Sequence, residues 1–207
     1  MLKSRLIPVR HRKHGSESSS VGGLPDALNK SCRPLLNDWQ ARTLCRHNSM
    51  TKSNILKLAV SLAVPLGVGF AGSIYTRDSI QDGWYSSLNQ PSFNPPNWVF
   101  GPVWTVLYIL MGISLYMVWK QVPGRKRENA LGIFALQLLL NFLWSLFFFY
   151  FKDIEIALID IVALWFTIVL MIGMFHRVNP LAAKLNIPYL LWVTFAATLN
   201  TAYYVLN

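Results

Sequence analysis

Two sets of side chains in the C-terminal half of the sequence could bind a flat ligand inside a membrane. The members of each set are three or four residues apart: Gln137, Asn141 and Trp144 in the first, and Trp192, Ala196 and Asn200 in the second. Such spacing places each set on one face of a helix, where it combines aromatic rings with amides. Because amides within a membrane are costly unless they find partners, both faces should point into a helix bundle.

A planar, mostly apolar ligand with a few acceptors or carboxylates suits such faces. Tryptophan rings stack on flat molecules, while indole N–H and amide groups orient them. The alternative is that the amides only join helices by hydrogen bonds. No nucleophile–base pair or group of metal ligands stands out, and Cys32 and Cys45 lack the spacing of a zinc site. We therefore expect no metal site and no hydrolytic catalysis.

A proline-rich stretch from residue 84 to residue 108 carries the densest aromatic cluster: Trp84, Tyr85, Phe93, Trp98, Phe100, Trp104 and Tyr108. Pro91, Pro95 and Pro96 stiffen it, because proline fixes its own backbone and restricts the preceding residue. Unless it folded over the helix ends, this loop would expose a large apolar patch. The stretch predicts a rigid lid over residues 84–96, followed by a helix that places Trp104 in a pocket wall. An aromatic belt at the membrane surface is the alternative.

Five long apolar runs must position these groups. The sequence is 53% hydrophobic and only 14% charged, a deficit of charge that indicates a lipid environment. About 20 residues cross a bilayer, and each run reaches that length. We predict an all-α membrane protein: a five-transmembrane-helix bundle over residues 53–207 with a structured, proline-rich loop between helices 1 and 2. The expected helices lie at about residues 55–75, 98–119, 130–151, 154–175 and 187–206.

The first 52 residues differ from the rest. They hold ten Lys and Arg against three acids and show no sustained apolar pattern, which predicts a disordered basic extension. It is either a targeting segment or a tail that touches anionic lipid, and Met50 could be an alternative start. A mitochondrial outer membrane is favoured, with the ER, Golgi or plastid envelope as alternatives. The basic loops favour a cytoplasmic N-terminus, and the body offers no basic face for nucleic acid.

The stretch from Trp84 to Tyr108 matches W-Y-x-x-L-x-x-P-x-F-x-P-P-x-W-x-F-G-P-V-W-T-x-L-Y. This pattern resembles the signature of the TspO/MBR family of translocator and tryptophan-rich sensory proteins. The likeness extends from about Val64 to the end of the chain. It is supported by residues 137–144, 157–160, 179–183, 188–192, 195–196 and 199–200.

The resemblance implies a pocket under the first loop that binds porphyrins, sterols or flat drug-like molecules, in a protein that forms homodimers. The positions that match the family pocket are Trp104, Asn141, Trp144, Trp192 and Ala196, with Asn200 on the same stripe as the last two. The lid would be supplied by Tyr85, Pro91, Pro95 and Pro96. Porphyrin or haem would be a ligand, and no obligatory cofactor is implied.

The function that follows is binding of tetrapyrroles for transport, scavenging or stress-linked regulation. One alternative is light- and oxygen-dependent breakdown of protoporphyrin, with Trp104, Trp144 and Trp192 as redox partners. Others are a sterol transporter and a membrane scaffold. The chain ends Tyr203-Tyr204-Val205-Leu206-Asn207 without the basic residue of the animal sterol motif, which favours tetrapyrroles. For the intramembrane Asp160 we expect a structural hydrogen-bonding role rather than proton relay.

Overall fold

The computed structural model describes residues 38–207, with side chains from residue 52 onward. Residues 1–37, which hold most of the expected N-terminal extension, lie outside this part. The chain divides into two units, Met1–Asn48 and Ser49–Asn207. The second unit contains all the candidate functional residues, and the following sections describe it.

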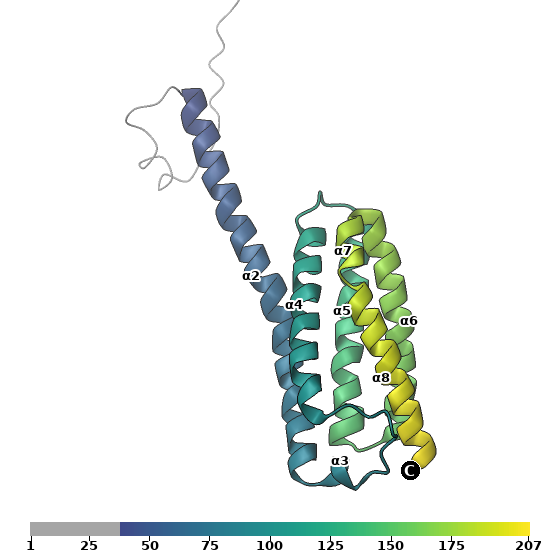
Figure 1. Cartoon of the computed structure of the whole chain (residues 1–207). Coiled ribbons are helices and arrows are strands. Elements are labelled where there is room, and N and C mark those ends of the chain that lie inside the picture. Colours follow the sequence, from purple (N-terminus) through teal and green to yellow (C-terminus); the bar gives the residue numbers. More distant parts are fainter. Residues whose placement is uncertain (1–37) are drawn as a thin grey trace, which may run out of the picture. The chain divides into compact units, whose positions relative to one another are not determined.

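Every regular element within residues 38–207 is helical, as the apolar runs predict (Figure 1). The long elements are α2 (Asp38–Gln81), α4 (Phe100–Trp119), α5 (Arg125–Ser145), α6 (Ile154–Val178) and α8 (Ile187–Leu206). Shorter elements are α3 (Trp84–Ser87), α7 (Pro180–Lys184), the 3₁₀ turn η1 (Asn97–Val99) and the π-helical turn η2 (Leu146–Tyr150). The neighbours α4, α5, α6 and α8 run side by side, with α3 at one end of the bundle and α7 at the other.

Three helices extend beyond the bounds expected from hydropathy. The first was expected over residues 55–75, but α2 begins at Asp38 and continues to Gln81. It ends only before Gly83, whose φ of 81° is left-handed and suits glycine at a helix end. The third was expected to begin near residue 130, but α5 begins at Arg125. The smallest extension is that of α6, which was expected over residues 154–175 and ends at Val178. Polar side chains continue a helix past the apolar span, so loss of hydropathy does not mark the end of helical backbone.

Four helices in the described part of the chain are long and apolar enough to cross a membrane. They cover Lys52–Gln81, Asn97–Trp119, Arg125–Tyr150 and Ile154–Val178. Mean hydropathy over their most apolar windows ranges from 1.7 to 2.5, which is compatible with a hydrocarbon environment. The protein is therefore an integral, multi-pass membrane protein.

The helices α2 and α4 approach each other closely at two glycines. A Cβ atom on Gly112 would lie 2.8 Å from the backbone oxygen of Ser61, and a Cβ on Gly69 would overlap the ring of Tyr108. Small residues of this kind let membrane helices pack at short range. The packing at Gly69 is important for the site, because it places α2 directly against one of the aromatic residues of α4.

Candidate ligand-binding cavity

A cavity of about 840 Å³ lies at the end of the bundle that carries α3. Its lining comes from α2, α3, η1, α4, α5, η2 and α8, so almost every element of the bundle contributes to it. Pockets for small organic ligands commonly have volumes of roughly 300–1,000 Å³ and mostly apolar walls. The cavity falls within that range, and its walls are dominated by aromatic side chains.

Three tryptophans line this cavity: Trp104 from α4, Trp144 from α5 and Trp192 from α8. Each is packed against a second aromatic ring. The ring of Trp104 stacks on Tyr108 with centroids 5.5 Å apart. That of Trp144 stacks on Phe148 at 5.4 Å. The ring of Trp192 meets Phe100 edge to face at 6.0 Å. Because each ring is supported by a neighbour, the walls present flat surfaces of fixed orientation.

The polar groups of the wall are partly used by the protein itself. The Nε1 atom of Trp144 donates a hydrogen bond to Oδ1 of Asn200 at 3.0 Å, and Nδ2 of Asn200 donates to the backbone oxygen of Ile154 at 3.2 Å. Within residues 52–207, the indole N–H groups of Trp104 and Trp192 make no such bond, unlike those of Trp144 and Trp165. These two donors are therefore not used within this part of the protein.

Asn141 does not line the cavity. It lies in a buried chain of hydrogen bonds that joins three helices. Its Oδ1 accepts from the hydroxyl of Tyr108 at 2.6 Å, and its Nδ2 donates to the hydroxyl of Tyr189 at 3.1 Å. Tyr189 in turn donates to Oε1 of Gln137 at 3.0 Å. Of these residues Tyr108 alone reaches the cavity, so Asn141 sits one hydrogen bond behind the wall.

The loop that follows α2 is tied to the C-terminal end of α8. The buried Tyr85 of α3 accepts a hydrogen bond from the hydroxyl of Tyr203 at 2.9 Å and donates one to Oδ1 of Asn94 at 3.3 Å. Further along, the backbone N–H of Asn89 donates to Oδ1 of Asn207 at 2.8 Å. Tyr85 and Tyr203 both line the cavity, so this loop contributes directly to its wall.

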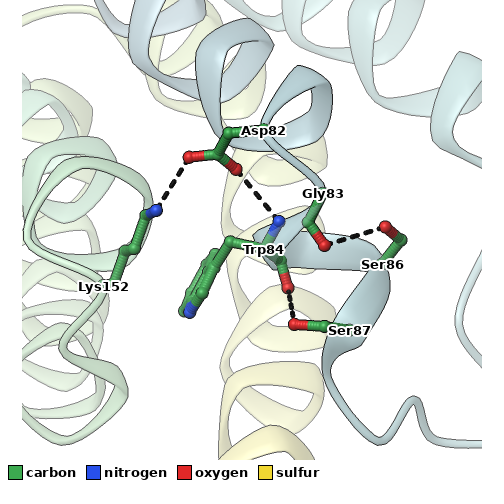
Figure 2. Close-up of polar contacts among 6 residues, drawn as sticks. All are labelled: Asp82, Gly83, Trp84, Ser86, Ser87 and Lys152. Carbon is green, nitrogen blue, oxygen red and sulfur yellow. Dashed lines mark hydrogen bonds and ion pairs between the residues drawn. The ribbon is translucent and has the colours of Figure 1, made fainter.

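A second attachment joins the same loop to the turn between η2 and α6 (Figure 2). Nζ of Lys152 lies 2.7 Å from Oδ2 of Asp82, and Oδ1 of Asp82 accepts the backbone N–H of Trp84 at 2.9 Å. Hydrogen bonding from Lys152, and then from Trp84, lowers the pKa of Asp82 below its ordinary value. Lys152 adopts a φ of 58°, a left-handed conformation unusual for a residue with a side chain. Both charged side chains are well exposed, so the pair is weak.

The structure brings together six of the ten residues expected at the binding site. The six that line the cavity are Tyr85, Trp104, Trp144, Trp192, Ala196 and Asn200. The other four, Asn141, Pro91, Pro95 and Pro96, are not part of the lining. The three prolines belong to the irregular segment between α3 and η1. Contact between any of the ten and a ligand stays a prediction.

Sequence reasoning missed several lining residues. Tyr108 and Phe100 lie four residues on either side of Trp104, and Phe148 lies four after Trp144, so each shares a helix face with a tryptophan. That spacing could have revealed them. The lining residues of α2 gave no such signal. They recur at helical spacing but mix apolar, polar and charged side chains, so no single chemistry marks their face: Leu66, Gly69, Phe70, Ser73, Thr76, Arg77 and Ile80. Their role depends on how α2 packs on α4, which the sequence does not specify.

Asp160 of α6 is buried and does not line the cavity. The hydrogen-bonding role expected for it is not observed, because its Oδ2 has no partner within residues 52–207. In the same part of the chain, no group of three or more His, Cys, Asp or Glu side chains is arranged to hold a metal ion.

The fold and the cavity together define a multi-pass α-helical membrane protein with an aromatic pocket at one end of its bundle. Residues 61–206 match the TspO/MBR family, and the chain belongs to that family. It is 44% identical over 155 residues to the tryptophan-rich protein TspO of Archaeoglobus fulgidus, covering 74% of this chain and 99% of that one. TspO of Chlorobaculum tepidum is 45% identical over 159 residues, 74% of this chain and 97% of its own. The translocator protein of Sus scrofa is 40% identical over 133 residues, 62% and 79% of the respective chains.

Proposed function

We propose that this translocator-type protein binds porphyrin- or haem-type tetrapyrroles in its cavity, for their transport, scavenging or stress-linked regulation. The observation that carries the proposal is the lining of a cavity of about 840 Å³ by Trp104, Trp144 and Trp192, each supported by a second ring. A tetrapyrrole is a large flat aromatic molecule, so it can stack on such walls while the indole N–H groups of Trp104 and Trp192 contact its polar atoms.

The direct test is titration of the purified protein with protoporphyrin IX in the dark, followed by quenching of tryptophan fluorescence. We expect saturable quenching that weakens several-fold in Trp144→Phe, which loses both indole stacking surface and the bond to Asn200. Trp165→Phe is the matched control, because Trp165 also donates from Nε1, to Thr194 at 2.9 Å, but does not line the cavity. Quenching that does not saturate, or equal effects of the two substitutions, would contradict the proposal.

A second candidate function is supported by the same three tryptophans, which could act as redox partners in light- and oxygen-dependent breakdown of bound protoporphyrin. Illuminating the complex in air separates the two functions. If the protein only binds protoporphyrin, the porphyrin bleaches no faster than in a protein-free control. Breakdown bleaches it at a rate that falls in phenylalanine variants at positions 104, 144 and 192. If a sterol competes with protoporphyrin and binds more tightly, a role in sterol transport is favoured over tetrapyrrole binding and over protoporphyrin breakdown.

We also propose that α8 is the fifth membrane span. Its 20 residues, Ile187–Leu206, contain no charged side chain, and at ~1.5 Å per residue they would extend about 30 Å, the thickness of a bilayer core. The cavity draws on α8 through Trp192 and Tyr203, which supports placing it within the bundle at the same depth. Labelling single cysteines at the two ends of α8 with a membrane-impermeant reagent tests this span, which requires the ends to lie on opposite sides.

The membrane that holds the protein is a separate proposal. Relatives from an archaeon and a bacterium show that the family is not confined to mitochondria. The basic segment over residues 1–52 supports an organelle, with the mitochondrial outer membrane as our proposal. Imaging fluorescent fusions of the whole chain and of a chain starting at Met50 tests this, because loss of a targeting segment would redirect the shorter protein. Formation of a homodimer is likewise proposed, and the mass of the detergent-solubilised protein tests it.

A further inference from the structure

We propose that Arg77 makes the cavity selective for flat apolar ligands that carry a carboxylate, by pairing with that carboxylate at the edge of the cavity. The inference rests on the proposed function and extends it from a ligand shape to a ligand charge. Arg77 belongs to the last two turns of α2, and among the residues with described side chains it is the single charged one in the cavity lining. Every other lining side chain is apolar or neutral.

Within residues 52–207 the charge of Arg77 is not paired. Its guanidinium has no ion-pair partner among the residues whose side chains are described. The adjacent Asp78 forms no ion pair there either, and Asp82 is already held by Lys152 at 2.7 Å. An arginine that faces a mostly apolar cavity without a partner gains most from an anion brought by the ligand, because its planar fork matches a carboxylate.

Two neutral amide side chains line the same cavity as Arg77. Gln81, one turn further along α2, and Asn97, at the start of η1, also line the cavity. Within residues 52–207 neither side chain forms a hydrogen bond to another residue, so each has a donor that a ligand can use. The tryptophans 104, 144 and 192 provide the stacking surface. A cavity with stacking rings and a few polar side chains suits an amphiphilic ligand that has a flat apolar body and a carboxylate at its edge.

The exposure of Arg77 limits the size of the effect. Arg77 is exposed, so a charge pair there is partly screened by water and salt. Exposed pairs contribute little, and about a fivefold preference for the acid over its uncharged ester is the scale we expect. The preference should shrink as the salt concentration rises.

Comparison of protoporphyrin IX with its dimethyl ester tests this selectivity, because the two share the same ring and differ in charge. Dissociation constants are measured by fluorescence quenching in an uncharged maltoside detergent. For the wild type and for R125Q, we expect the acid-to-ester preference to be about fivefold. Arg125 is an exposed cation at the start of α5 that does not line the cavity, so R125Q removes the same charge elsewhere. In R77Q the preference should fall to near one.

R77K should keep part of the preference, because lysine retains the charge but not the planar fork. An unchanged preference in R77Q would overturn the inference while leaving tetrapyrrole binding in place. Failure of both compounds to bind the wild type would overturn the proposed function and the inference with it. Repeating the measurement in zwitterionic phosphocholine nanodiscs addresses lipid phosphate as the competing partner of Arg77. Loss of the wild-type preference there would show that lipid occupies the guanidinium, and would also overturn the inference.

Discussion

The inner wall of the cavity, formed by α4, α5 and α8, and the loop after α2 are held by contacts of different strength. Behind the wall, Tyr108, Asn141, Tyr189 and Gln137 form a buried chain of hydrogen bonds that joins α4, α5 and α8. The loop after α2 is anchored by one buried bond, from Tyr203 to Tyr85, while its flanks are attached by the exposed pair of Asp82 and Lys152 and by hydrogen bonds between Asn89 and Asn207. Buried bonds of this kind are costly to break, whereas exposed ones compete with water.

This difference suggests a division of roles. A rigid inner wall keeps the tryptophan rings in fixed orientations, which lowers the entropy lost when a flat ligand binds. The exposed flanks of the loop can open while Tyr85 stays anchored, since local opening there requires few buried contacts to be broken. Polar residues on the inner side should therefore determine stability, while polar residues at the loop should determine how fast a ligand enters and leaves.

The largest effect on the inner wall is expected from Gly69→Ala. The added methyl group would overlap the ring of Tyr108, so the ring or α2 must move, at a cost of about 1–3 kcal/mol for an overpacked site. Gly67→Ala is the matched control on the same helix, because nothing lies within 4 Å of a Cβ at that position. Thermal unfolding in detergent should show a lower midpoint for the first variant alone. Equal midpoints would mean that α2 does not pack on α4 as described.

A smaller loss of stability is expected from Asn141→Ala. The substitution leaves the buried hydroxyls of Tyr108 and Tyr189 without their shared amide, and a cost of about 1–2 kcal/mol follows from unsatisfied polar groups in a membrane protein. Asn97→Ala removes an amide that lines the cavity without an internal partner, so it should leave the unfolding midpoint unchanged. If Asn97→Ala proved the more destabilising of the two, the contrast between wall and edge would be wrong.

The smallest effect on stability is expected at the loop, from Lys152→Gln. Both partners of the ion pair are exposed, so the unfolding midpoint should hardly move, while ligand dissociation measured by stopped-flow should become faster. The pKa of Asp82 lies below its ordinary value of 3.8. The ion pair between Asp82 and Lys152 is therefore fully formed above pH 3.8 and is lost as the pH falls through the lowered pKa of Asp82. Wild-type dissociation should stay constant at neutral pH and approach that of Lys152→Gln only in strong acid.

An unchanged dissociation rate in Lys152→Gln would show that the loop does not control release. Asp153→Ala provides a control in the same turn, because Asp153 caps α6 by accepting the backbone N–H of Ile156 and makes no hydrogen bond or ion pair to the loop after α2 within residues 52–207. It should alter stability more than ligand release.

The sequence predicted the positions of the helices and the aromatic residues of the site better than its polar contacts. Helical spacing places Trp144 and Asn141 on nearly the same side of α5, yet Trp144 reaches the cavity while Asn141 bonds Tyr108 and Tyr189 behind it. Spacing identifies a face of a helix, whereas partners across the bundle depend on the depth and rotation of the neighbouring helices. The same limit applies to Arg77, whose place in the lining follows from how α2 packs on α4.

The most direct measurement of the central claim is the affinity for protoporphyrin IX after the cavity has been filled. Ala196 of α8 is buried and lines the cavity, so Ala196→Phe should reduce the affinity by at least tenfold. Thr198→Phe adds a ring to an exposed position on the same helix and should leave the affinity unchanged. Equal affinities of wild type and Ala196→Phe would contradict binding in this cavity.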